Sequence, residues 1–172
     1  MLTSRINFVN FNVKKHSAFV KKKLISILKS KNEVLNSLSQ NYKNRFSKKI
    51  LSKYKKASNY RIIGMGGSTL GTQAIYDFLK HKIKNNFLFA DNLHGDLTKE
   101  KKKIKNLIIS KSGNTIETIV NANILIKKKD INIFITENKN SYLFSLAEKL
   151  KSDIIHHNNY IGGRYSVLSE VG

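Results

Sequence analysis

Residues 107–118, which read Leu-Ile-Ile-Ser-Lys-Ser-Gly-Asn-Thr-Ile-Glu-Thr, decide the fold of this chain. An apolar run stops abruptly in hydroxyl groups, one lysine, one glycine and one asparagine, and an amphipathic stretch then begins. This pattern predicts a buried strand that delivers Ser110, Lys111, Ser112 and Thr115 to the carboxyl edge of a sheet. The next helix offers unpaired backbone N–H groups and the positive end of its dipole to an anion. The segment therefore predicts a phosphate-binding cradle.

A nucleotide-binding P-loop is the competing interpretation of this segment. It requires G-x-x-x-x-G-K-[ST], whereas here Lys111 precedes Gly113, the only glycine of the stretch. The order of residues thus favours a sugar phosphate over a nucleotide. Glu117 follows within the first helical turn, where a carboxylate interacts favourably with the helix dipole.

A second glycine-rich segment occupies residues 61–71, Arg-Ile-Ile-Gly-Met-Gly-Gly-Ser-Thr-Leu-Gly. Gly64, Gly66 and Gly67 permit a tight turn and a close approach of the backbone to a ligand, and Ser68 can cap the following helix. The dinucleotide fingerprint G-x-G-x-x-G fails because Thr69 stands where the third glycine is needed. Taken alone, this loop more often turns the chain than binds a ligand.

The third segment is residues 161–172, Ile-Gly-Gly-Arg-Tyr-Ser-Val-Leu-Ser-Glu-Val-Gly. Two glycines let the backbone bend sharply, so that Arg164 projects from a constrained position before a helix that Ser166 could cap. Such an arginine suits an anionic ligand or a developing negative charge. The alternative for the segment alone is a surface turn with a solvated arginine.

Short apolar runs alternate with helical patterns after residue 59. Strands are expected at 61–64, 87–90, 107–110, 131–136 and 153–156, with helices near 69–82, 97–103, 115–128 and 142–150. Nearly continuous apolar strands in this alternation predict an α/β fold, a parallel sheet of about five strands covered by helices on both faces. Right-handed crossovers then bring the loops after Gly64 and Ser110 to one edge, where such sheets bind ligands.

The amino-terminal residues predict a helical extension of two amphipathic helices. One set of apolar residues at helical spacing comprises positions 19, 20, 24, 27 and 28, and the other positions 38, 42, 46, 50 and 54. We expect both helices to cover an edge or face of the sheet. A lysine-rich amphipathic helix could also lie on an anionic membrane, but this alternative is less favoured.

Composition limits the remaining function classes. The chain has 172 residues, enough for one domain plus an extension, and no cysteine, which excludes disulfides and a cysteine nucleophile and fits the cytoplasm. No apolar run approaches the roughly 20 residues of a membrane span, and residues 1–17 lack the apolar centre of a signal peptide, so no membrane partner is expected.

The net charge of +21 raises the question of a nucleic-acid partner. The lysines, however, form short dispersed runs, and no nucleic-acid-binding motif or aromatic platform accompanies them. Lys, Asn and Ile are abundant, Arg is scarce and Pro is absent, as AT-rich coding would produce. We therefore expect no nucleic acid among the partners.

Two clusters could suggest a metal. His156 and His157 are adjacent, but neighbouring strand residues point to opposite faces, so we expect one packed and one exposed side chain. Asp91, His94 and Asp96 could ligate a cation, although turn formation and helix capping explain them better. Neither a metal nor a cofactor is expected.

With the three segments in this order, the chain resembles the glucose-6-phosphate isomerase family, specifically its first sugar-isomerase (SIS) domain. The matching words are Gly64-Met-Gly-Gly-Ser-Thr-Leu-Gly71, Ser110-Lys-Ser-Gly-Asn-Thr-Ile-Glu-Thr118 and Gly162-Gly-Arg-Tyr-Ser-Val-Leu-Ser169, of which the last is the most specific. The resemblance implies a three-layer SIS-type fold over residues 59–172, preceded by the helical extension 1–58. Departures include Met65, Ser112-Gly-Asn in place of Thr-Phe-Thr, and Glu170 at a usually small position.

The resemblance also implies a cofactor-free interconversion of glucose 6-phosphate and fructose 6-phosphate through an enediol, by an enzyme that is a homodimer at full length. It assigns substrate contact to Gly67 and Ser68, phosphate binding to residues Ser110, Lys111, Ser112 and Thr115, and charge stabilisation to Arg164. It also keeps Glu117 near the site. The family's base Glu, ring-opening His and Lys all lie carboxyl-terminal to the matched words, and Glu170 is not that Glu.

Two function classes remain open at this point. In the first, the chain is the amino-terminal, substrate-binding part of an isomerase and is inactive alone. In the second, it is a single-SIS module that binds a phosphosugar without catalysis, or that builds a different site between subunits. The sequence motif at residues 162–166 favours the first class.

Overall fold

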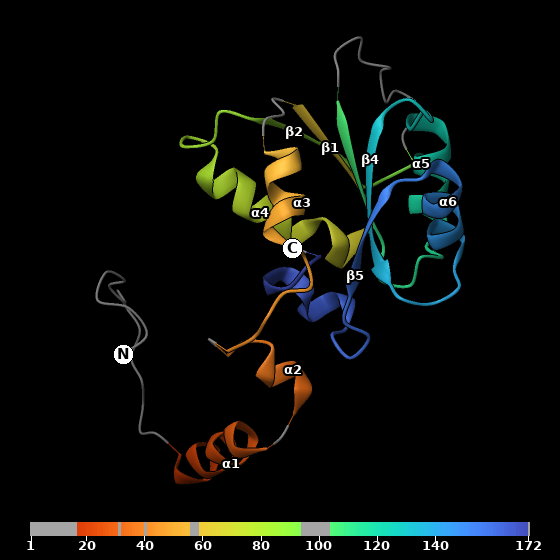
Figure 1. Ribbon diagram of the computed structural model, residues 1–172. Helices are drawn as coiled ribbons and strands as arrows, with labels where there is room; N and C mark the ends of the chain where they lie inside the picture. The colour runs from red at the N-terminus through yellow and green to blue at the C-terminus, as the bar shows by residue number, and fades with distance from the viewer. Residues whose placement is uncertain (1–16, 31, 40, 56–58, 94–103, 172) are drawn as a thin grey trace.

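A computed structural model describes residues 17–30, 32–39, 41–55, 59–93 and 104–171. Its centre is a parallel sheet in the order β2-β1-β3-β4-β5, which lies between two layers of helices (Figure 1). The predicted α/β sheet of about five strands is thereby confirmed. The strands are β1 (Asn59–Ile63), β2 (Asn86–Ala90), β3 (Lys105–Ile109), β4 (Ile131–Glu137) and β5 (Asp153–His157).

The apolar runs form strands because both of their faces are buried, and alternate residues enter two separate cores. Ile108 and Phe134 point to one face, where they pack with Ala122 and Leu143. Ile109 points to the other, where it packs with further residues of that core: Tyr54, Ile62, Ile133, Ile135, Ile155 and Val171. Burial on both faces is what a parallel sheet requires of its central strands.

The helices that follow the strands begin at or near their predicted positions; the helix predicted at 142–150 has those bounds, and the two before it are shorter than predicted. They are α4 (Leu70–Leu79), α5 (Ile116–Leu125) and α6 (Tyr142–Leu150), and α5 and α6 cover one face of the sheet (Figure 1). Tyr76 of α4 packs on Phe87 and Phe89 of β2, on the opposite face. The helix predicted at 97–103 lies outside the described residues.

The prediction of one helix through residues 38–54 is wrong. The structure has α2 (Glu33–Asn36), then irregular chain, then α3 (Lys48–Tyr54). A new helix begins at residue 48 because the Ser47 hydroxyl caps it by accepting a hydrogen bond from the Ile50 N–H (3.2 Å). Before it, the Tyr42 hydroxyl donates to the distant Glu170 carboxylate, a bond that holds this part of the chain in a non-helical path.

The expected covering role of the extension holds for α3 but not for α1 (Ala18–Lys29). Tyr54 of α3 is buried against the sheet, and Lys53 forms an ion pair of 2.7 Å with Asp153 at the start of β5. In α1, by contrast, Phe19 is 68% exposed and Leu28 65% exposed, so its apolar stripe packs against nothing in the described chain. Within the described residues, no helix has the length and apolar character needed to cross a bilayer.

Candidate functional site

The candidate site lies at the carboxyl edge of the sheet, where the chain order reverses between β1 and β3. From β1 the chain moves outward to β2, and it then returns to β3 on the other side of β1. This switch point is where open α/β sheets leave a crevice for ligands. The two strands end close together, because a Cβ placed on Gly64 would lie 2.9 Å from the Ile109 carbonyl oxygen.

The loop after β3 is held in shape by its own hydroxyl groups. Ser110 and Thr115 are linked through their side-chain oxygens (2.9 Å), and the Ser110 hydroxyl also accepts from the Gly113 N–H (3.2 Å). Gly113 has φ +68, a left-handed conformation that favours glycine. The Ser112 hydroxyl accepts from the Asn114 N–H (3.2 Å). The structure therefore brings the predicted cradle residues together on one ordered loop.

The side chains of this loop differ in their exposure to solvent. Ser110 is only 1% exposed, so its hydroxyl shapes the loop from below. Lys111, Ser112 and Thr115 are half-buried, which leaves them accessible to a ligand. Thr115 occupies the cap position of α5, yet its hydroxyl bonds to Ser110 and does not cap the helix. Glu117 in the first turn of α5 is also half-buried.

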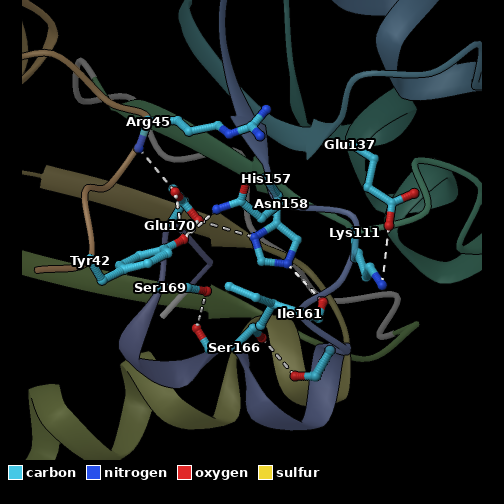
Figure 2. A network of polar contacts seen from close by, with 11 residues as sticks. Tyr42, Arg45, Lys111, Glu137, His157, Asn158, Ile161, Ser166, Ser169 and Glu170 are labelled. Carbon is cyan, nitrogen blue, oxygen red and sulfur yellow. Dashed lines mark hydrogen bonds and ion pairs between the residues drawn. The ribbon is translucent and has the colours of Figure 1, made fainter. Parts of the chain in front are cut away.

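Glu137, at the end of β4, is a site residue that sequence reasoning missed. Its buried carboxylate forms ion pairs with Lys111 (3.1 Å) and Lys139 (2.6 Å), and the first of these is drawn in Figure 2. The Glu137 N–H and the Thr136 hydroxyl both donate to the Lys111 carbonyl oxygen (3.0 and 3.3 Å). The ammonium group expected to meet a phosphate is thus already held by a carboxylate. Burial by itself would raise the pKa of Glu137, but hydrogen bonds from Lys139 and Lys111 outweigh burial and hold that pKa below its usual value.

We expect Glu137→Gln to lower the free energy of unfolding at neutral pH by about 1–2 kcal/mol, because charge-assisted hydrogen bonds to the carboxylate are lost. The carboxyl pKa is lowered in the folded protein, so its stabilising contribution is complete above the unfolded pKa and is lost as the pH falls through the folded value. The difference between wild type and variant should therefore shrink on acidification. Urea unfolding at a series of pH values measures it.

The matched control for this experiment is Asp77→Asn. Asp77 forms an exposed ion pair of 3.7 Å with Lys80, and such surface pairs contribute little. A difference for Glu137→Gln that stayed constant down to strongly acidic pH would contradict the assignment.

The Arg164 turn follows β5 as a 3-10 helix, Gly163–Leu168. Arg164 itself is exposed, and the turn packs against the loop after β1, since a Cβ on Gly67 would overlap the Gly163 carbonyl oxygen. The predictions that Ser166 and Ser68 cap helices are both wrong. Ser166 lies inside the 3-10 helix and donates to the Gly163 carbonyl (2.6 Å), and the cap position of α4 is Thr69 and not Ser68.

The adjacent residues His156 and His157 differ in burial. His157 has no exposed surface and contacts Glu170, as predicted for one member of the pair. The other member was expected to be exposed, but His156 is half-buried and its ring stacks on Phe144 with centroids 6.1 Å apart. The described residues include no group of three His, Asp or Glu side chains that could hold a metal ion, and His94 and Asp96 lie outside them.

A family model described as Phosphoglucose isomerase matches residues 4–172. The chain belongs to the phosphoglucose isomerase family. Among its relatives, a glucose-6-phosphate isomerase of Methanocaldococcus jannaschii is 39% identical over 138 residues, which cover 71% of this chain and 34% of the relative. One of Borreliella afzelii is 36% identical, over 69% of this chain and 26% of its own length.

The chain therefore spans about a third, or less, of the length of the curated relatives it matches. Among solved structures, a hypothetical protein from Thermus thermophilus superposes with a TM-score of 0.65 at 20% identity, covering 90% of this chain and 41% of the other. At that identity the likeness concerns the fold alone, and it agrees with the predicted SIS-type architecture.

Proposed function

We propose that the chain is the substrate-binding part of a glucose-6-phosphate isomerase, which interconverts glucose 6-phosphate and fructose 6-phosphate through an enediol intermediate. The observation that carries the proposal is the hydroxyl cradle at residues 110–115, set at the switch point of a phosphoglucose isomerase fold. Residues 59–172 would form the SIS domain, with residues 1–58 as its extension.

The phosphate would lie on the loop after β3. The Ser112 and Thr115 hydroxyls and the N–H groups of the first turn of α5 would donate to it, and Ser110 would keep the loop in place. The Lys111 ammonium group would interact with the phosphate as well as with Glu137. Lys139 would keep its ion pair with that carboxylate. The phosphate site would thus be tuned by a competing internal anion.

The sugar would extend toward the loop after β1 and the turn after β5. Gly67 and Ser68 would contact it, and the Arg164 guanidinium would stabilise negative charge on the enediol. The close packing of Gly67 on Gly163 supports this placement, because it brings the β1 loop beside the arginine turn. Glu117 would lie near the ligand without touching the reacting carbons.

The isomerase proposal includes a cytoplasmic homodimer, with no cofactor, nucleic acid or membrane among its partners. Proton transfer between C1 and C2 needs a general base, and we place that base in a second SIS domain. The alternative is a single-SIS phosphosugar-binding module or regulator without isomerase activity, which the same cradle would also serve. Turnover by an enzyme that contains this chain distinguishes the two.

We expect this chain to bind fructose 6-phosphate or 6-phosphogluconate weakly, and Lys111→Ala combined with Ser110→Ala to weaken that binding. Charge-assisted hydrogen bonds to phosphate are each worth about 1.5–3 kcal/mol, so the double variant should lose at least 10-fold in affinity. Isothermal titration calorimetry measures it. Lys129→Ala, a cation remote from the β3 loop in sequence, is the control for general charge. Equal affinity in wild type and double variant would reject the phosphate site.

A further inference from the structure

Glu170 lies just beyond the arginine turn with its side chain fully buried. Its carboxylate accepts from the Arg45 backbone N–H (3.0 Å) and from the Tyr42 hydroxyl (3.2 and 3.3 Å), and it lies 3.3 Å from His157 Nδ1 (Figure 2). Burying a carboxylate is costly unless several donors satisfy it. Here two segments far from Glu170 in the sequence, the chain before α3 and the end of β5, converge to do so.

Both ring nitrogens of His157 lie within hydrogen-bond distance of an oxygen atom. His157 Nε2 lies 3.1 Å from the Ile161 carbonyl oxygen, and because a carbonyl only accepts, Nε2 carries a hydrogen. Nδ1 and a bare carboxylate would then face each other with lone pairs unless one proton lies between them. A proton between them therefore links the two side chains, and each ring nitrogen of His157 faces one acceptor.

This pair fastens both ends of the segment that carries Arg164. One imidazole nitrogen of His157 holds Ile161, immediately before the two glycines, and the other holds Glu170, after the 3-10 helix. His157 is the last residue of β5, so the anchor point belongs to the rigid sheet. Between the two ends, the segment is braced by serine hydroxyls, which donate from Ser166 to Gly163 and from Ser169 to Ser166.

The same carboxylate also fixes the amino-terminal chain to this turn. Tyr42 receives a short hydrogen bond from the Asn158 amide and donates to Glu170, which also accepts from the Arg45 N–H. The strand end, the arginine turn and the chain before α3 thus meet at one buried carboxyl group.

We propose that Glu170 and His157 are positioning residues that hold Arg164 in place for a sugar phosphate. The inference rests on the proposed function, and it adds that the affinity depends on two side chains that do not touch the ligand. Glu170 acts through Ile161, His157 and the 3-10 helix, and Arg164 makes the contact.

The test compares Glu170→Ala and Glu170→Gln in the whole chain by calorimetry with fructose 6-phosphate. We expect Glu170→Ala to lower the affinity by about 10-fold or more, because the end of the turn after the 3-10 helix loses its anchor on His157 and on the chain before α3. Glu170→Gln should stay within about threefold of wild type, since its amide can donate to Nδ1 and accept from the Arg45 N–H. In an Arg164→Ala background, Glu170→Ala should have no additional effect.

The matched control is Asp153→Asn, which breaks another tie between the amino-terminal chain and β5, the contacts of Lys53 and Tyr54, at the opposite end of that strand. It should cost stability and leave the affinity unchanged. Equal losses of affinity in Asp153→Asn and Glu170→Ala would overturn the proposal, as would a full additional loss in the Arg164→Ala background.

Nuclear magnetic resonance provides a test without ligand. The wild type should show a slowly exchanging proton between His157 and Glu170, separate from the Nε2 proton, and a rigid Arg164 amide. In Glu170→Gln that amide should stay rigid, and in Glu170→Ala it should become mobile. A rigid Arg164 amide in Glu170→Ala would reject the positioning role, whereas a wild type that keeps these signals but binds no sugar phosphate would count against the proposed function alone.

Discussion

The 172-residue chain alone is expected to convert fructose 6-phosphate no faster than the uncatalysed background. Two described carboxylates by the Arg164 turn and the cradle are unsuited to remove a proton, because Glu170 is fully buried and Glu137 is held by two lysines. Binding the substrate without a base lowers no chemical barrier. A general base contributes about 100- to 10,000-fold, so its absence brings any rate toward background.

The assay couples formation of glucose 6-phosphate to a dehydrogenase and runs three proteins side by side. These are the short chain, the same chain joined to a second SIS domain, and the joined protein with Arg164→Ala. The joined protein should turn over, and its Arg164→Ala variant should lose about 100- to 1,000-fold, as the removal of one oxyanion donor does. Robust turnover by the short chain would identify Glu117 or His156 as the base and reject the proposed roles.

Replacing Gly67 by Ala should both destabilise the protein and weaken sugar phosphate binding. The added Cβ would overlap the Gly163 carbonyl oxygen, which is backbone and can retreat only if the whole arginine turn moves. Overpacking of this kind costs about 1–3 kcal/mol. Because the displaced turn carries Arg164, we also expect the affinity to fall by about 10-fold or more, in proportion to the loss of a charge-assisted contact.

Gly163→Ala is the control, because a Cβ at that position meets nothing within 4 Å. Thermal unfolding and calorimetry of both variants separate stability from affinity. A Gly67→Ala protein as stable as Gly163→Ala would mean that the two loops do not pack as closely as described.

The sheet could be predicted from the sequence because each strand is marked by residues that are adjacent in the chain. Runs such as Leu107–Ile109 are apolar without interruption, and only a strand buried on both faces suits them. The phosphate loop was equally accessible, since Ser110, Gly113 and Thr115 make their hydrogen bonds within five residues of one another.

The helix expected at residues 38–54 failed because a four-residue spacing of apolar side chains can arise without a helix. Leu38 is exposed, and Tyr42 points its hydroxyl to a carboxylate far along the chain. Ser47 was the available signal, since a serine before a helical stretch indicates a helix start.

Glu137 and His157 were missed as site residues for a different reason. Their meaning depends on partners from other elements, Lys111 in one case and Glu170 in the other, and no spacing rule connects them. Glu170 did stand out as a large, charged residue at a usually small position. This departure from the family pattern pointed to Glu170, but its partners Tyr42, Arg45 and His157 could be identified only from the structure.

The bonds from Tyr42 and Arg45 to Glu170 also set an order of events during synthesis. The partners are 128 and 125 residues apart, so the amino-terminal chain leaves the ribosome long before its carboxylate exists. At roughly 5–20 residues per second, the wait lasts on the order of 6–25 s. Throughout that interval Tyr42 lacks this partner, and the chain before α3 can be joined to the arginine turn only after Glu170 has been made.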